Sequence, residues 1–139
     1  MAAAIERHGD LTQIGLSALG EYRTRLPQSE RPHYFSGMAK WMGRYAANEA
    51  PNYPIARVEW VDQSMRGSYG SIVVDSRVVL ANGSGYDVRW VLSKYGSTYK
   101  VRDAMILGFS MTTQLQSLFE DYISKNGGNP RALAAALHR

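Results

Sequence analysis

The stretch GSIVVDSRVVLANGSGYDVRWVLSKYGSTYKVRDAMIL, residues 70–107, decides the fold class. Apolar and polar side chains alternate through it with a period of two, which is the spacing of a β-strand. Short links precede and interrupt it at Arg66-Gly67-Ser68, Asn82-Gly83-Ser84-Gly85 and Gly96-Ser97. Links of this kind join neighbouring antiparallel strands into hairpins. We therefore expect an antiparallel meander of four strands, spanning residues 55–65, 70–82, 86–95 and 98–107.

The same alternation assigns the side chains to two faces of the predicted sheet. One face is predicted to carry Val58, Trp60, Ile72, Val74, Val78, Leu80, Tyr86, Val88, Trp90, Leu92, Tyr99, Val101, Met105 and Leu107. The opposite face is predicted to carry Arg57, Glu59, Asp75, Arg77, Asp87, Arg89, Lys100 and Arg102. A sheet with one apolar and one charged face is covered by other elements on one side only.

Helical periodicity flanks the predicted sheet on both sides. Apolar residues recur every three or four positions in residues 10–20, 29–49 and 110–125, and Asn129-Pro130 begins a last helix through Leu137. This order predicts one α+β domain over residues 1–139, with helices packed on the apolar sheet face. A curved sheet crossed by helices forms a cone of the NTF2-like or cystatin-like type, and such folds often hold a pocket.

Composition narrows the classes of function. The 139 residues carry a net charge of +4 and no cysteine, which excludes thiolate metal sites and a cysteine nucleophile. His8, His33 and His138 do not stand at metal-ligand spacing, and no nucleotide, hydrolase or metalloprotease motif is present. On the charged sheet face, acidic residues interrupt the arginines, which argues against nucleic acid as a partner. We therefore predict no catalytic residue, no metal and no cofactor.

Asp103 is the acidic residue whose place in the alternation points to the apolar sheet face. In some cone-shaped α+β enzymes, a single inward carboxylate acts as a general base. The other interpretation is a structural carboxylate that accepts hydrogen bonds from a helix N-terminus, a backbone amide, or Arg23 or Arg25. We favour the structural role and keep a small enzyme that uses Asp103 as the alternative.

Residues 99–119, YKVRDAMILGFSMTTQLQSLF, carry a more specific pattern. They resemble the MlaC family, the soluble component of the Mla phospholipid transport system, also called toluene-tolerance auxiliary proteins. In that family a last strand of the approximate form W-K-V-Y-D-V-x-V-E-G-V-S precedes a helix of the form L-x-x-x-Y-R-x-x-F. The matching positions here are Lys100, Val101, Asp103, Gly108, Ser110 and Phe119. Upstream, Ala18-Leu19-Gly20 with Tyr22 and residues 26–46, LPQSERPHYFSGMAKWMGRYA, also resemble family motifs.

Three positions depart from the family pattern. Leu107 stands where the family has Glu, and Leu115 and Gln116 stand where it has Tyr and Arg. These departures suggest a divergent branch, with another lipid such as a hopanoid as an alternative cargo. The family also carries a signal peptide and further N-terminal helices that this sequence lacks, so we expect the chain to be shortened at its N-terminus.

The resemblance implies a periplasmic carrier that encloses phospholipid acyl chains and moves lipid between the inner and outer membranes, a role in outer-membrane lipid asymmetry. It implies an inner-membrane ABC transporter complex and an outer-membrane lipoprotein complex as partners, and lipid as cargo in place of a cofactor. The predicted pocket is lined by Phe35, Met38, Met42, Trp60, Ile72, Val74, Val78, Trp90, Leu92, Val101, Met105, Phe109, Leu115 and Phe119. A further alternative is a module with a filled interior that docks a protein partner.

Overall fold

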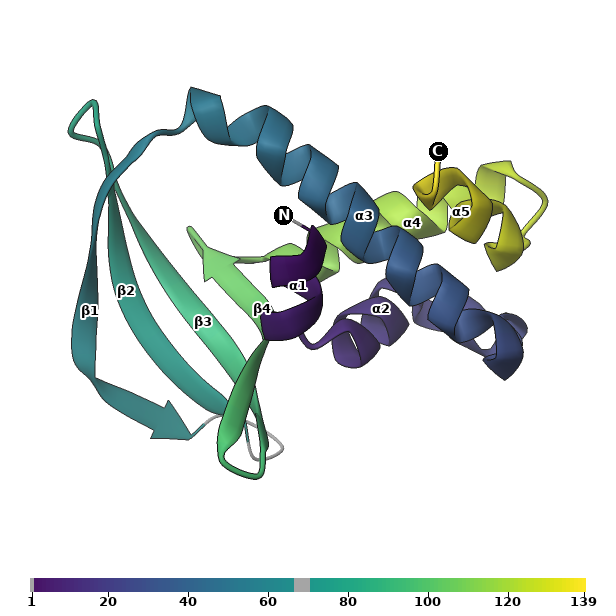
Figure 1. Cartoon of the computed structure of the whole chain (residues 1–139), viewed down its shortest axis with the longest axis horizontal. Helices are drawn as coiled ribbons and strands as arrows, with labels where there is room; N and C mark the ends of the chain where they lie inside the picture. Colours follow the sequence, from purple (N-terminus) through teal and green to yellow (C-terminus); the bar gives the residue numbers. More distant parts are fainter. Residues whose placement is uncertain (1, 67–70) are drawn as a thin grey trace.

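The chain forms a group of helices beside a curved antiparallel sheet (Figure 1). The computed structural model describes residues 2–66 and 71–139, and for residues 62–66 it describes the backbone alone. The helices are α1 (Ala2–His8), α2 (Leu11–Leu19), α3 (Arg31–Glu49), α4 (Met111–Lys125) and α5 (Pro130–Leu137). The strands are β1 (Ile55–Arg66), β2 (Ile72–Leu80), β3 (Gly85–Tyr95), β4 (Thr98–Ile106) and β5 (Phe109–Ser110). Short 3-10 turns span Gly20–Arg25, Gln28–Glu30 and Ala50–Asn52.

The sheet has the order β1-β2-β3-β4-β5, and each strand pairs antiparallel with its neighbour along the chain. This confirms the α+β class and the meander predicted from the alternation. The expected break after β1 lies largely outside the described residues. The fifth strand was not predicted, because two residues are too few to show a period of two.

A tight hairpin joins β4 to β5 through Leu107 and Gly108. Both residues have positive φ, 54° at Leu107 and 82° at Gly108, as the two central positions of a type I′ turn require. Glycine adopts this conformation freely, whereas a leucine there costs about 1–2 kcal/mol. The sheet, expected to end with the strand over residues 98–107, therefore continues through this turn into β5.

A register shift in β4 changes the faces that alternation predicts. Val91 pairs with Asp103, but the next residue, Leu92, pairs with Val101, so β4 carries one extra residue. Directly paired residues share a face, and an extra residue reverses the parity of all that follow. Met105 pairs with Arg89 and therefore lies on the charged face, which corrects its predicted place on the apolar face.

The buried core lies within the helical part. Its largest fully buried side chains include Tyr34 and Met38 of α3 and Phe119 of α4. The Tyr34 hydroxyl donates a 2.8 Å hydrogen bond to the carbonyl of Gly15 in α2, and burial raises the pKa of this phenol. Glycine is needed at position 15 because a Cβ there would lie 2.7 Å from the Phe35 ring. These contacts lock α2 against α3.

The sheet joins the helices along β4, where α1, α2 and α4 contact it. The amide of Asp10 donates to the carbonyl of Val101 at 2.8 Å, and the Asp10 side chain caps α2 by accepting from the amide of Gln13. Helix α1 was not predicted, because seven residues show little periodicity. The helices do not pack across the whole apolar sheet face, which leaves the faces of β1 to β3 largely free of helical cover (Figure 1).

Candidate functional site

An apolar pocket of about 470 Å³ lies between the helices and β4. This volume falls within the range of pockets that enclose small molecules. The pocket is lined by Ile5, Ile14, Trp41, Met42, Tyr45, Ala46, Val101, Arg102, Asp103, Ala104, Met111, Thr112, Gln114, Leu115 and Leu118. Four helices and a strand thus contribute, and most of the lining side chains are hydrophobic.

Several lining side chains of this pocket remain open to solvent. Tyr45 of α3 is 59% exposed, and Leu118 of α4 is 52% exposed. Met111, in the first turn of α4, is 38% exposed. Large apolar side chains that stay exposed inside a concavity favour an apolar occupant, because each gains free energy when water is removed from it.

The apolar face of the sheet extends this surface. Val58 pairs with Val78 and Trp60 pairs with Ser76, which places both β1 side chains on that face. Trp60 is 59% exposed, and its ring centroid lies 6.5 Å from that of Trp90. The indole N–H of Trp90 donates to the Ser76 hydroxyl at 3.0 Å, so the ring presents only carbon to the open side.

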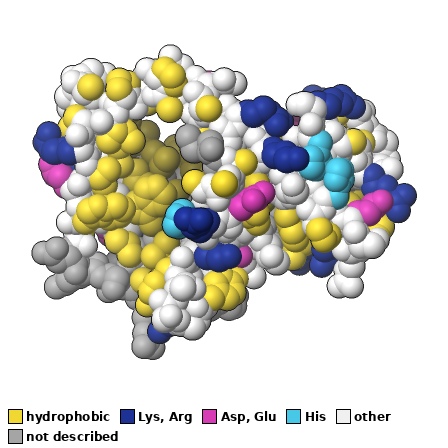
Figure 2. Space-filling model, viewed as in Figure 1, with side chains coloured by type: hydrophobic (Ala, Val, Ile, Leu, Met, Phe, Trp, Pro, Cys, Tyr) yellow, Lys and Arg dark blue, Asp and Glu magenta, His cyan; other side chains and the backbone are white. Residues whose placement is uncertain are grey.

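The space-filling view shows the result as a hollow between the sheet and α3, lined by hydrophobic side chains (Figure 2). Monomeric proteins seldom expose contiguous apolar surface of this kind unless it binds something. Concavity and apolar lining together favour a flexible hydrophobic ligand over a flat protein surface. We call this region, formed by the apolar pocket and the apolar face of β1 to β3, the apolar hollow.

Asp103 borders the pocket, but its carboxylate holds the start of α4. One oxygen accepts from the amides of Ala104, at 2.8 Å, and Thr112, at 3.0 Å. The other accepts from the Ser110 hydroxyl at 2.6 Å. Hydrogen bonds of this kind, from backbone amides and from the start of a helix, are those that the structural interpretation expects.

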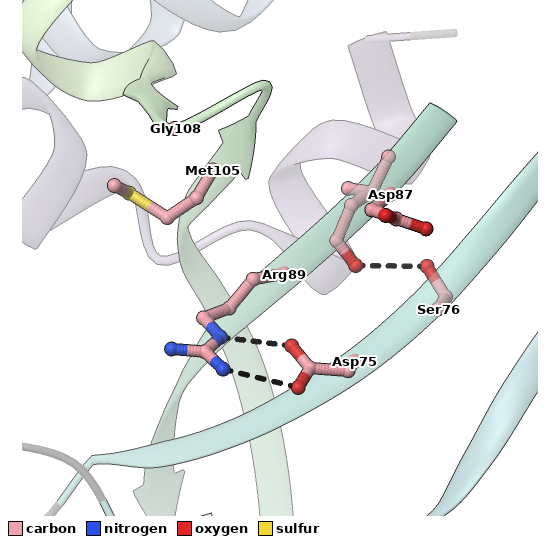
Figure 3. A pocket seen from close by; sticks show the side chains of 7 residues that line it. Asp75, Ser76, Asp87, Arg89, Met105 and Gly108 are labelled. Carbon is pink, nitrogen blue, oxygen red and sulfur yellow. Dashed lines mark hydrogen bonds and ion pairs between the residues drawn. The ribbon is translucent and has the colours of Figure 1, made fainter. Parts of the chain in front are cut away.

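A second, polar depression lies on the charged face of the sheet (Figure 3). Arg89 donates to both carboxylate oxygens of Asp75, at 2.8 and 3.1 Å, and Met105 and Gly108 lie beside this pair. The hydrogen bond from Arg89 holds the pKa of the Asp75 carboxyl below its usual range. The ion pair is exposed, and each partner neutralises the charge of the other.

The structure divides the fourteen predicted pocket residues among five places. Met42, Val101 and Leu115 line the apolar pocket. The apolar sheet face holds Trp60, Ile72, Val74, Val78, Trp90 and Leu92. Met38 and Phe119 belong to the buried helical core, and Phe35 packs against it. Met105 lies on the charged face, and Phe109 is exposed opposite Ile106 beside the β4–β5 turn.

Several pocket residues were missed. Trp41 and Tyr45 belong to the apolar stripe of α3, a signal that could have found them. Ala104 was missed because the extra residue in β4 reverses its parity, and Ile5 lies in the unpredicted α1.

No group of three or more His, Asp or Glu side chains in the described part of the chain could hold a metal ion. Among the described helices, none is both long and apolar enough to cross a membrane. The hollow itself offers hydrophobic contact and little polar chemistry.

Comparison with known proteins gives the family. The fold is similar to that of a phospholipid-binding protein from Ralstonia solanacearum, solved in complex with a phospholipid. The TM-score is 0.76 at 21% sequence identity, over 94% of this chain and 72% of that chain. None of the curated proteins compared with the chain matches it. The family model described as MlaC protein matches residues 1–139, and the chain therefore belongs to the MlaC family.

Proposed function

We propose that this protein is a phospholipid carrier that holds acyl chains in the apolar hollow. The observation that carries the proposal is the exposure of large apolar side chains, such as Trp60, Tyr45 and Leu118, around a concave space. The similar protein from Ralstonia solanacearum was solved with a phospholipid, which supports a ligand of this class here.

The energetics favour lipid tails as the occupant. Transfer of each methylene from water into an apolar space contributes about 0.8 kcal/mol. A long acyl chain therefore gains on the order of 10 kcal/mol before the costs of ordering it. Such a carrier needs an apolar space for the tails and an opening for the headgroup, but no catalytic group.

The finer proposal is that the carrier works in the periplasm and moves phospholipid between the inner and outer membranes. Family membership supports this, with a membrane ABC transporter and an outer-membrane lipoprotein complex as the partners that load and unload it. An ATPase partner would supply the energy, because the proposed carrier itself only binds and releases lipid.

Native mass spectrometry of the gently purified protein tests the proposal. We expect a bound species whose mass identifies a phospholipid and separates it from a hopanoid. The substitution Leu118→Lys places a charge on the pocket wall, where a buried cation opposes acyl chains. Because Leu118 is half exposed, this change should lower lipid content with little loss of stability.

Ser117→Lys is the matched control, because Ser117 is the preceding, exposed residue of α4 and does not line the pocket. It should keep the wild-type lipid content. A wild-type protein that reproducibly carries no lipid, and takes up none from vesicles, would contradict the proposal. Equal lipid content in both variants would place the lipid elsewhere on the molecule.

A further inference from the structure

One face of α3 carries a row of residues that do not line the apolar pocket. His33, Gly37, Lys40 and Arg44 follow one another at spacings of four, three and four residues. Residues at these spacings lie above one another along a single side of an α-helix. The row therefore presents two lysine or arginine cations and a histidine on one side of α3.

The end of α5 packs on the same row and adds to it. The His138 ring stacks on the His33 ring, with centroids 4.0 Å apart and planes inclined by 12°. A Cβ at Gly37 would lie 2.7 Å from the His138 ring, so glycine makes room for this stack. Arg44 donates to the carbonyl of Leu137 at 2.8 Å, which holds the guanidinium against the end of α5.

We call His33, Lys40, Arg44 and His138 the basic patch. Within the described residues, neither Lys40 nor Arg44 makes an ion pair, and both are exposed. The carboxylate of nearby Glu30 is already bound by Arg131 at 2.6 Å. The charges of Lys40 and Arg44 are therefore not neutralised by an ion pair within the described residues, and they belong to a chain with a net charge of +4.

The basic patch and the apolar hollow face the same way. Figure 2 shows the paired histidines, with Lys and Arg side chains around them, on the same face of the molecule as the hollow. A flat anionic surface laid on the basic side of this face would also approach the opening of the hollow. A bilayer that contains anionic phospholipids has the required charge and flatness, and it attracts exposed Lys and Arg side chains.

We propose that the basic patch docks this protein onto anionic phospholipid bilayers, with the apolar hollow turned toward the membrane. This inference rests on the proposed function, because docking in this orientation serves a protein that takes up or releases lipid. The contact is electrostatic and reversible. It differs from insertion, since the patch contains cations and histidines and no exposed apolar wedge.

Vesicle flotation at low and high salt tests the docking. We expect the lipid-loaded protein to bind vesicles of phosphatidylcholine mixed with phosphatidylglycerol and not vesicles of phosphatidylcholine alone. High salt should release it, because salt screens exposed charges. Lys40→Glu changes the patch charge by two units and should weaken binding to the anionic vesicles by at least about tenfold. Lys40→Arg should bind like wild type.

The matched control is Lys94→Glu, which makes the same change of charge at an exposed residue of β3, outside the patch. Compared at physiological ionic strength, where the Debye length is about 8 Å, it should weaken binding by less than about twofold, because exposed charges beyond that length are largely screened. Two results would overturn the docking: equal losses of binding in both variants, or a wild-type protein that does not bind anionic vesicles at low salt. In the second case, an acidic protein would be the partner that the patch fits.

Native mass spectrometry of the same samples separates the two proposals. The Lys40→Glu variant should carry as much phospholipid as wild type, because the basic patch does not line the apolar pocket. A protein that carries lipid but does not bind anionic vesicles contradicts the docking alone. A protein with no lipid at all contradicts the proposed function.

Discussion

Large apolar side chains are buried in the helical part of this molecule, whereas several on the sheet are exposed to solvent. In the helical part, Leu19, Met38 and Phe119 are 0–2% exposed and pack against one another. On the sheet, Ile55 and Trp60 of β1 are 61% and 59% exposed. Both regions are rich in large hydrophobic residues, so composition does not separate them. The difference is the one expected if the helical core holds the fold together and the exposed sheet face binds the proposed ligand.

Packing explains the difference. Helices α2 to α5 form a core among themselves and touch the sheet along β4. The other strands are held by the hydrogen bonds of the sheet and have little helical cover. Substitutions in the two regions should therefore have different effects on the free energy of unfolding and on lipid content.

The largest effect is expected from Met38→Ala in the helical core. Met38 is fully buried, so its truncation leaves a cavity and should lower the free energy of unfolding by about 2–5 kcal/mol. Urea denaturation measures it. Trp60→Ala, on the open sheet face, should change that free energy by about 1 kcal/mol or less while lowering lipid content. Equal destabilisation by the two substitutions would remove the distinction between the regions.

The next effect is expected from Asp103→Ala, at the junction of the two regions. Loss of its carboxylate leaves the Thr112 amide and the Ser110 hydroxyl without their acceptor, at a cost of about 1–3 kcal/mol. Thermal unfolding would show a lower Tm, and lipid content at low temperature should be unchanged. A folded variant that has lost its lipid would instead place this carboxylate in the binding site.

A smaller effect, of opposite sign, is expected from Leu107→Gly in the β4–β5 turn. Glycine removes the strain of a leucine at φ 54°, and this gain exceeds the entropy that glycine loses on folding. The variant should be more stable by about 0.5–1 kcal/mol in urea denaturation. A destabilised variant would show that the exposed Leu107 side chain makes a contact that offsets its backbone strain.

The smallest effect is expected from Asp75→Asn on the charged sheet face. Arg89 lowers the pKa of Asp75 in the folded protein, so the pair stabilises the fold above the unfolded pKa of the carboxyl. That contribution is lost as the pH falls through the folded pKa. Because the pair is exposed and screened, the variant should unfold like wild type at neutral pH. A clear loss of stability there would show that the pair organises the sheet.

The sequence predicted the order of elements better than the assignment of residues to the site. Alternation located four strands, but the extra residue in β4 moved Met105 to the charged face and Ala104 to the apolar one. Bulges of this kind leave no signature in a period-two pattern.

Helical periodicity did not separate side chains of the filled core from those that line the pocket. Met38 and Met42 share one stripe of α3, yet Met38 lies in the core and Met42 lines the pocket. A helical stripe shows which side chains face inward, but only the packing of other elements decides whether the space before them is filled. The core and the hollow therefore became distinct only in the structure.

The most direct test of the apolar hollow is fluorescence quenching by phosphatidylcholine brominated on its acyl chains. The chain has three tryptophans, and Trp41→Phe leaves only Trp60 and Trp90, on the apolar sheet face. Lipid bound in the hollow brings bromine close to both rings, and we expect their emission to fall as the variant takes up brominated lipid. Unchanged emission, in a variant that native mass spectrometry shows to be loaded, would contradict a lipid site on this face.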